Sequence, residues 1–323
     1  RAKTSSPAAD MENRGETAGS VLRIEKSSIH DGDGLRTVLF LKGCPLRCLW
    51  CSTPESQRMV PERGLSREKC LRCGRCVEQC PQGALTMGED GINFDRNRCA
   101  GCLKCASVCP SSAVVPYGKK MTANEAVCEI AKDEIFYFHS GGGLTVSGGE
   151  PLDQSGFVRE VLAGCCERGI DCAIESSFFA PWEKIEPLLP YISLLHVDIK
   201  HPNAEKHKKL IGVDNGLILE NIRRADGAPY DFGLVIRTPL IPGINDGDEE
   251  IVKLAEIVKG LKKLRFMEFL AYHRLGTETY KRLGLDYPLA EIKTPDAAYM
   301  RRRAAVFKKA AGVTVKIKGR IFE

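Results

Sequence analysis

The stretch TVLFLKGCPLRCLWC, residues 37–51, decides the fold and the chemistry of this chain. It begins with an apolar, β-rich run that predicts a strand, and it continues into a loop that carries Cys44, Cys48 and Cys51. Three thiolates can hold a [4Fe–4S] cubane and leave its fourth iron open. A metal that binds a substrate needs such an open coordination position. We therefore expect reactive chemistry at the C-terminal end of this strand.

Similar apolar stretches recur downstream and predict further strands, with helical patterns between them. The predicted strands are residues 37–42, 144–147, 171–175, 194–199, 232–237 and 264–269. The predicted helices are residues 122–133, 155–168, 182–189, 216–225, 246–261 and 295–311, and an edge strand is expected at 313–318. The alternation of strands and helices is typical of a parallel sheet or barrel.

The interval from Thr53 to Tyr117 breaks this alternation and carries eight cysteines in two similar units. Each unit has the spacing C-x2-C-x2-C-x3-C-P of bacterial two-cluster ferredoxins, in which the fourth cysteine of each run binds the other cluster. One predicted cluster is held by Cys70, Cys73, Cys76 and Cys109, and the other by Cys99, Cys102, Cys105 and Cys80. Two zinc sites are the alternative, but such sites usually space their ligands as two separated pairs.

This interruption divides the chain into an inserted module at residues 53–117 and a host barrel at residues 20–52 and 118–323. Residues 1–19 are polar and small, without the apolar segment of a secretory signal, and they predict a disordered tail. No run of 18 or more apolar residues suggests a membrane span. We expect a cytoplasmic protein that binds no membrane.

The cysteine content and the net charge both indicate metal. Fifteen cysteines without an export signal argue against disulfides, and eleven of them fall in three tight groups. The formal net charge of +5 suggests a nucleic-acid partner at first sight. Eleven thiolates around three [4Fe–4S]²⁺ cores contribute about −5, which cancels this charge. We therefore expect no nucleic-acid partner.

The spacing Cys44-x3-Cys48-x-Trp50-Cys51 resembles the motif of radical S-adenosylmethionine (SAM) enzymes. The resemblance implies that SAM binds the open iron and that one electron cleaves it to methionine and a 5′-deoxyadenosyl radical. Gly148, Gly149 and Glu150 follow the second predicted strand and resemble the family's GGE motif, which receives the SAM amino group. Glycines let a backbone approach a ligand closely, and a carboxylate accepts hydrogen bonds from an ammonium group.

Residues 29–37, IHDGDGLRT, together with residues 53–56, TPES, resemble the activating enzymes of glycyl radical enzymes. Larger members of that family carry a ferredoxin insertion directly after the third cysteine. The resemblance extends from about Val21 to Phe322. It implies a partial (β/α)6 TIM-like barrel with an inserted bacterial-type 2[4Fe–4S] ferredoxin domain, and a monomer.

Further site residues are carried over from this family by position. Asp198 and Lys200 match its D-[LI]-K motif, and Arg237 and His273 match positions that contact SAM. Arginine suits a carboxylate because its planar fork donates two parallel hydrogen bonds. Glu175 and Ser176 match an acid and hydroxyl pair that, with Asp198 and the carbonyl of His196, would hold a monovalent cation.

Three functions fit these observations. The first is an activase that abstracts a Cα hydrogen from a glycine of a partner glycyl radical enzyme, with a flavodoxin or ferredoxin as electron donor. The second is a ferredoxin-like electron carrier, which needs no open iron and leaves the GGE and D-I-K motifs unexplained. The third is a radical SAM enzyme that acts on a small molecule, which the resemblance across the chain disfavours.

Overall fold

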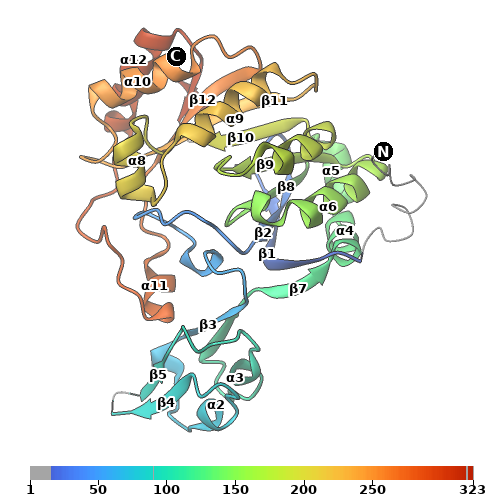
Figure 1. Ribbon diagram of the computed structural model, residues 1–323, viewed down its shortest axis with the longest axis vertical. Coiled ribbons are helices and arrows are strands. Elements are labelled where there is room, and N and C mark those ends of the chain that lie inside the picture. The colour runs from blue at the N-terminus through green and yellow to red at the C-terminus, as the bar shows by residue number, and fades with distance from the viewer. Residues whose placement is uncertain (1–15, 90, 318, 323) are drawn as a thin grey trace, which may run out of the picture.

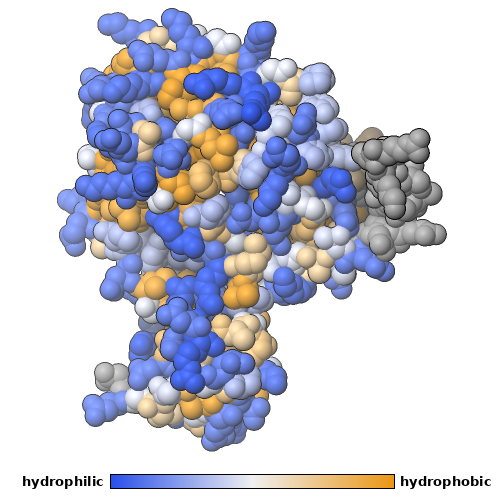
Figure 2. Space-filling model, in the orientation of Figure 1, coloured by the Kyte–Doolittle hydropathy of each residue, from blue (hydrophilic) through white to orange (hydrophobic). Residues whose placement is uncertain are grey.

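The computed structural model describes residues 16–89, 91–317 and 319–322. A large body holds the sheet and most helices, and a small lobe lies below it in Figure 1. Figure 2 shows the lobe joined to the body through a narrow neck. None of the helices in the described residues is long and apolar enough to cross a membrane.

Six neighbouring parallel strands form the centre of the main sheet, and they follow one another in chain order. These strands are β2 (Arg36–Leu41), β8 (Gly143–Gly148), β9 (Asp171–Ser176), β10 (Leu194–Asp198), β11 (Gly233–Leu240) and β12 (Leu264–Ala271). Several of them are buried along nearly their whole length, as expected for a parallel sheet covered on both faces. The predicted α/β fold, a partial TIM-like barrel, is confirmed.

Four shorter or antiparallel strands extend the sheet at its two edges, in the order β14-β13-β12 at one side and β2-β1-β7 at the other. They are β1 (Ala18–Ser28), β7 (Lys119–Thr122), β13 (Val315–Ile317) and β14 (Arg320–Phe322). The apolar patterns of the sequence did not predict β1, β7 or β14. Residues 1–15 of the expected tail lie outside the described residues, whereas Ala18 and Gly19, also assigned to the tail, belong to β1.

Helices follow the parallel strands and cover the sheet (Figure 1). They are α4 (Ala123–Ala131), α5 (Glu134–Ser140), α6 (Ser155–Glu167), α7 (Trp182–Ile185), α8 (Ala204–Ile211), α9 (Gly216–Gly227), α10 (Asp248–Val258), α11 (Thr277–Leu283) and α12 (Ala297–Ala311), with the 3₁₀ segments η3 (Pro151–Gln154) and η4 (Glu186–Tyr191). Helix α4 begins with a capping box between Thr122 and Glu125. The helix predicted at 182–189 changes to 3₁₀ geometry at η4, which contains Pro187 and Pro190, because proline lacks the N–H that a helix needs.

The lobe is the inserted module, built from two small antiparallel sheets and two short helices. Its elements are β3 (Glu62–Leu65), η2 (Arg67–Lys69), α2 (Arg75–Glu78), β4 (Leu85–Gly88), β5 (Gly91–Phe94), α3 (Lys104–Ser107) and β6 (Val114–Tyr117). Strand β3 pairs with β6, so the chain enters and leaves the module on neighbouring strands. The preceding η1 (Pro54–Ser56), which we had placed in the module, lies against the barrel, where Gly43 N donates to Ser56 O (2.7 Å).

A buried polar cluster lies where the module meets the barrel. Glu62 of β3 is fully buried and accepts from Arg96 (2.6 Å), with Arg58 (3.4 Å) and Lys42 (3.8 Å) also nearby. Burial lowers the pKa of Lys42 to about 8, and the charges of Glu62 and Glu55 act against this shift. Because Lys42 precedes the cysteine loop by one residue, this cluster joins β3 directly to the barrel mouth.

Candidate active site at the barrel mouth

A cavity of about 260 Å³ opens at the C-terminal ends of the parallel strands. The structure brings all but one of the predicted barrel residues to its wall: Cys44, Cys48, Trp50, Cys51, Gly148, Gly149, Glu175, Ser176, Asp198, Lys200, Arg237 and His273. Active sites of parallel barrels form at this end because the loops that follow each strand meet there. The exception is Glu150.

The two glycines after β8 let the backbone of this turn lie against the cysteine loop. Gly148 has φ +115°, and a Cβ there would lie 2.2 Å from Leu41 N. A Cβ on Gly149 would lie 2.2 Å from Gly43 O. Glu150 N donates to the same Gly43 carbonyl (2.6 Å). Only glycine fits at these two positions, and the turn thereby fixes the chain that leads into Cys44.

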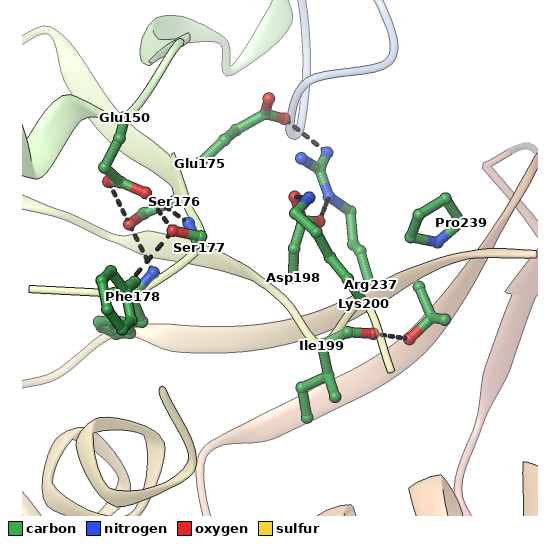
Figure 3. A network of polar contacts seen from close by, with 12 residues as sticks. Glu150, Glu175, Ser176, Ser177, Phe178, Asp198, Ile199, Lys200, Arg237 and Pro239 are labelled. Carbon is green, nitrogen blue, oxygen red and sulfur yellow. Dashed lines mark hydrogen bonds and ion pairs between the residues drawn. The ribbon is translucent and has the colours of Figure 1, made fainter. Parts of the chain in front are cut away.

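Glu150 points away from the cavity and into the protein, so within the GGE motif only Gly148 and Gly149 line the cavity. It is fully buried and accepts from Ser176 Oγ (2.6 Å), Ser177 N (2.8 Å), Ser177 Oγ and Leu152 N (3.1 Å), as Figure 3 shows in part. Burial raises the pKa of Glu150, and the hydrogen bonds from Ser176 and Ser177 oppose the shift. The carboxylate therefore fastens the turn after β9 to the GGE turn.

Four charged side chains form one network on the opposite wall (Figure 3). Arg237 Nη1 lies 2.6 Å from Glu175 Oε1, and Lys200 Nζ lies 2.9 Å from Asp198 Oδ2. Burial alone raises the pKa of Glu175, but Arg237 and His196 outweigh it and hold this pKa well below its usual range. Burial likewise raises the pKa of Asp198, and Lys200 and Arg237 more than reverse the shift. Both carboxylates are therefore ionised at neutral pH.

These residues do not fit the expected monovalent cation. The Arg237 guanidinium lies between the two carboxylates, 3.5 Å from Asp198 Oδ1 on its Nε side. Ser176 Oγ donates to Glu150 and is turned away from Glu175 and Asp198. A fixed positive charge therefore already occupies the position between the acids, and we assign no cation there.

The same wall does fit SAM and a cluster. The cavity sets the cysteine loop, the turn at Gly148 and Gly149, and the charged side chain of Lys200 around one space, which suits a cluster and a ligand with a carboxylate. Burial raises the pKa of the Cys48 thiol to about 12, and the charge of Lys200 acts against this shift, so Lys200 lies beside the cysteine loop. In residues 16–89, 91–317 and 319–322, no three His, Cys, Asp or Glu side chains converge as they would around a single metal ion.

Sequence reasoning missed several residues of this site. Ser177 and Tyr272 line the cavity next to the predicted Ser176 and His273, and adjacency was the only signal for them. His196, of which we had expected only the carbonyl to take part, is 3% exposed and places its ring Nδ1 3.4 Å from Glu175 Oε1. Burial raises the pKa of the Asp31 carboxyl, and the negative charge of Glu175 raises it further. Asp31 precedes β2, and nothing in the strand pattern indicates that its loop folds back toward the barrel interior.

A second cavity lies inside the module. Its lining includes Cys80 together with Cys99, Cys102 and Cys105, the four residues predicted to share one cluster. Cys80 belongs to the other sequence repeat, so this grouping supports the predicted crossing of the fourth cysteine. Arg63 of β3 lines the same cavity, although no motif of the sequence indicated it.

Two protein-family models match parts of this chain. Residues 97–255 match the Radical SAM superfamily, and residues 69–113 match the 4Fe-4S dicluster domain. A radical SAM methyltransferase from Sphaerobacter thermophilus has a similar fold, with a TM-score of 0.55 at 14% identity, over 96% of this chain and 80% of that one. Fold and site therefore define an iron–sulfur protein of the radical SAM class, with SAM and three [4Fe–4S] clusters as its cofactors.

Curated relatives narrow the class. The chain is 43% identical to the isethionate sulfite-lyase activating enzyme of Oleidesulfovibrio alaskensis, over 86% of this chain and 91% of the relative. It is 40% identical to the (2S)-3-sulfopropanediol dehydratase activating enzyme of Klebsiella oxytoca (88% and 91%) and 35% identical to the indoleacetate decarboxylase activating enzyme of Tractidigestivibacter scatoligenes (91% and 96%). The chain belongs to the activating enzymes of glycyl radical enzymes.

Proposed function

We propose that this enzyme cleaves SAM reductively at the barrel mouth and removes a Cα hydrogen atom from one glycine of a partner glycyl radical enzyme. When bound, the cluster on Cys44, Cys48 and Cys51 supplies the electron for this cleavage. The observation that carries the proposal is the cavity, which gathers those three cysteines, the glycine turn and the Arg237 network in one place. An electron carrier does not need that combination.

The chain's own residues bind and orient in this proposal, and none needs to act as a general base. Lys200 and Arg237 supply positive charge where a SAM carboxylate is held, and the turn at Gly148 and Gly149 admits close backbone contact. The aromatic rings of Trp50 and Tyr272 form an apolar part of the cavity wall, which keeps water from the reacting atoms. Hydrogen-atom transfer depends mainly on holding the donor C–H close to the radical, so positioning is the main contribution of the protein.

We further propose that the module passes electrons from a flavodoxin or ferredoxin to the barrel. Cys73 and Cys102, one ligand of each predicted module cluster, are exposed, so both clusters lie near the surface. Exposed basic residues surround them, namely Arg72, Arg75 and Lys104. Such charges favour an acidic electron donor.

For the partner, we propose a glycyl radical enzyme that acts on a sulfonate. The two sulfonate-linked activating enzymes share 43% and 40% identity with this chain, against 35% for the indoleacetate decarboxylase activating enzyme. The test is to incubate the reconstituted, reduced protein with SAM and each of the three corresponding partners. We expect a glycyl radical in the electron paramagnetic resonance (EPR) spectrum of a sulfonate-acting partner, and the strongest signal on the decarboxylase would contradict this choice.

The hydrogen transfer itself is tested with a partner that carries deuterium on its glycine α-carbons. We expect deuterium in the 5′-deoxyadenosine that is released, and none when the radical-bearing glycine of the partner is replaced by alanine. Deoxyadenosine without deuterium would favour action on a small molecule. No deoxyadenosine, with about eight irons per chain as two cubanes require, would favour the electron carrier.

A further inference from the structure

Arg63 is a buried arginine in the centre of the module without a carboxylate partner among the described residues. Its side chain is 2% exposed, and its Nε and Nη1 have no hydrogen-bond partner. The contact that the structure does give it is with the ring of Phe94, 4.8 Å from the guanidinium carbon. A cation–π contact gains less than it costs to remove a charge from water, so Phe94 alone does not explain why an arginine stands here.

The place of Arg63 on β3 indicates what compensates its charge. Successive side chains of a strand point to opposite faces, and Glu62 faces the barrel cluster of Lys42, Arg58 and Arg96. Arg63 therefore faces the module core, as does Leu65, which packs in that core. There it lines the cavity formed by Cys80, Cys99, Cys102 and Cys105.

The thiols around this cavity are the groups that act most on the charge of Arg63. Burial lowers the pKa of its guanidinium, and Cys105, Cys76 and Cys99 are the strongest opposing influences. Two of these belong to the cluster predicted in the cavity, and Cys76 belongs to the other cluster. Arg63 thus lines the cavity of one predicted cluster and is close enough to a ligand of the other to be influenced by its charge.

We propose that Arg63 is the internal counter-charge of the cluster held by Cys80, Cys99, Cys102 and Cys105, and that it raises the reduction potential of this cluster. A [4Fe–4S] core with four thiolates changes its formal charge from about −2 to about −3 when it takes up one electron. A buried guanidinium nearby stabilises the more negative form, and its unpaired N–H groups can donate to the sulfur atoms. The electron comes from the donor protein, and no proton is taken up because arginine stays protonated.

The effect of Arg63 on the reduction potential does not depend on SAM cleavage at the barrel. The role of that potential in electron transfer to the barrel rests on the proposed function. The potential is therefore measured without SAM, in the full chain carrying Cys48→Ala, so that only the module clusters contribute. Reductive titration followed by EPR measures the reduction of the module clusters in this parent chain and in its Arg63→Met and Arg63→Lys variants. The matched control is Arg98→Met, an exposed arginine next to Cys99 whose charge is screened by water.

We expect Arg63→Met to lower the equilibrium constant for reduction of one module cluster by about tenfold or more, which is about 59 mV for one electron. Arg63→Lys retains a positive charge, so it should lower this constant less than Arg63→Met does. Arg98→Met should titrate like the parent. An unchanged titration for Arg63→Met, or an equal shift for Arg98→Met, would overturn the proposal.

A second measurement does not depend on the assembly of Arg63→Met. In the reduced chain labelled with ¹⁵N-arginine, electron spin echo modulation should detect an arginine nitrogen coupled to a module cluster. The coupling should vanish in Arg63→Lys and persist in Arg98→Met. Absence of the coupling in the labelled parent would show that Arg63 does not contact a cluster, and would end the proposal.

Discussion

The barrel and the module hold cysteines of the same kind in opposite surroundings. The barrel packs a continuous apolar core through its sheet, whereas the main core cluster of the module, among the described residues, has six buried members. All three cysteines of the barrel loop are at least partly covered, whereas the module exposes Cys73 and Cys102. The barrel therefore shapes its site by packing, and the module depends on its clusters for its structure.

The largest expected effect comes from the barrel loop. Cys48→Ala should abolish deoxyadenosine formation while the iron content falls from about twelve to about eight per chain. The control is Cys128→Ala, which changes an exposed cysteine on α4 and should leave both values unchanged. Iron and deoxyadenosine are measured on the same sample. A loss of all iron would mean that the two cluster regions do not assemble independently.

The next largest effect is expected when iron is removed from the whole protein, because the module and the barrel should respond differently. A chelator should unfold the module but leave the barrel folded, because only the module lacks an adequate apolar core. Amide hydrogen exchange should speed up by roughly tenfold or more across residues 62–117 and change little in β8 to β12. Equal loss of protection in β10 would contradict the contrast drawn between the regions.

Arg237→Met tests the charged network of the barrel. We expect the free energy of unfolding to fall by about 3–5 kcal/mol at pH 7, because Glu175 is left as a buried charge without its partner. The control Arg224→Met removes an exposed pair with Glu220 and should cost less than about 1 kcal/mol. Chemical denaturation of the holoprotein gives both values.

The same network makes stability depend on pH. The pKa of Glu175 is lower in the folded than in the unfolded protein, so its contribution is present above the unfolded carboxyl pKa and is lost as pH falls below it. Wild type should therefore lose stability on acidification more steeply than Arg237→Met. Parallel pH profiles would show that the pair does not set this dependence.

The smallest expected effect is that of Glu150→Gln. An amide has one acceptor oxygen, so the variant loses part of the four hydrogen bonds and should be less stable by about 1–3 kcal/mol. The affinity for SAM should change little, because Glu150 does not line the cavity. Glu249→Gln, at an exposed position, is the control. Weaker SAM binding at unchanged stability would indicate a direct contact between the Glu150 side chain and SAM.

The sequence predicted the six parallel strands and every cysteine and charged residue of the cavity wall. Parallel strands are apolar along their length, and site residues follow strand ends, so local pattern suffices for both. The direction of each side chain is a tertiary property. Nothing in GGE indicates that Glu150 turns inward to Ser176 and Ser177, or that Arg237 takes the place expected for a cation. Strand β1 has a buried half and an exposed half, and that mixture hid it.

Strand β1 also bears on how the chain is made. During synthesis, β2 leaves the ribosome long before its parallel neighbour β8, because the whole module is translated between them. Strand β1 precedes β2 and pairs with it in antiparallel fashion, so the nascent chain can already cover one edge of β2 with a local hairpin. Strand β1 thus shields β2, the strand that leads into the cysteine loop, from wrong partners while the ribosome completes the insertion.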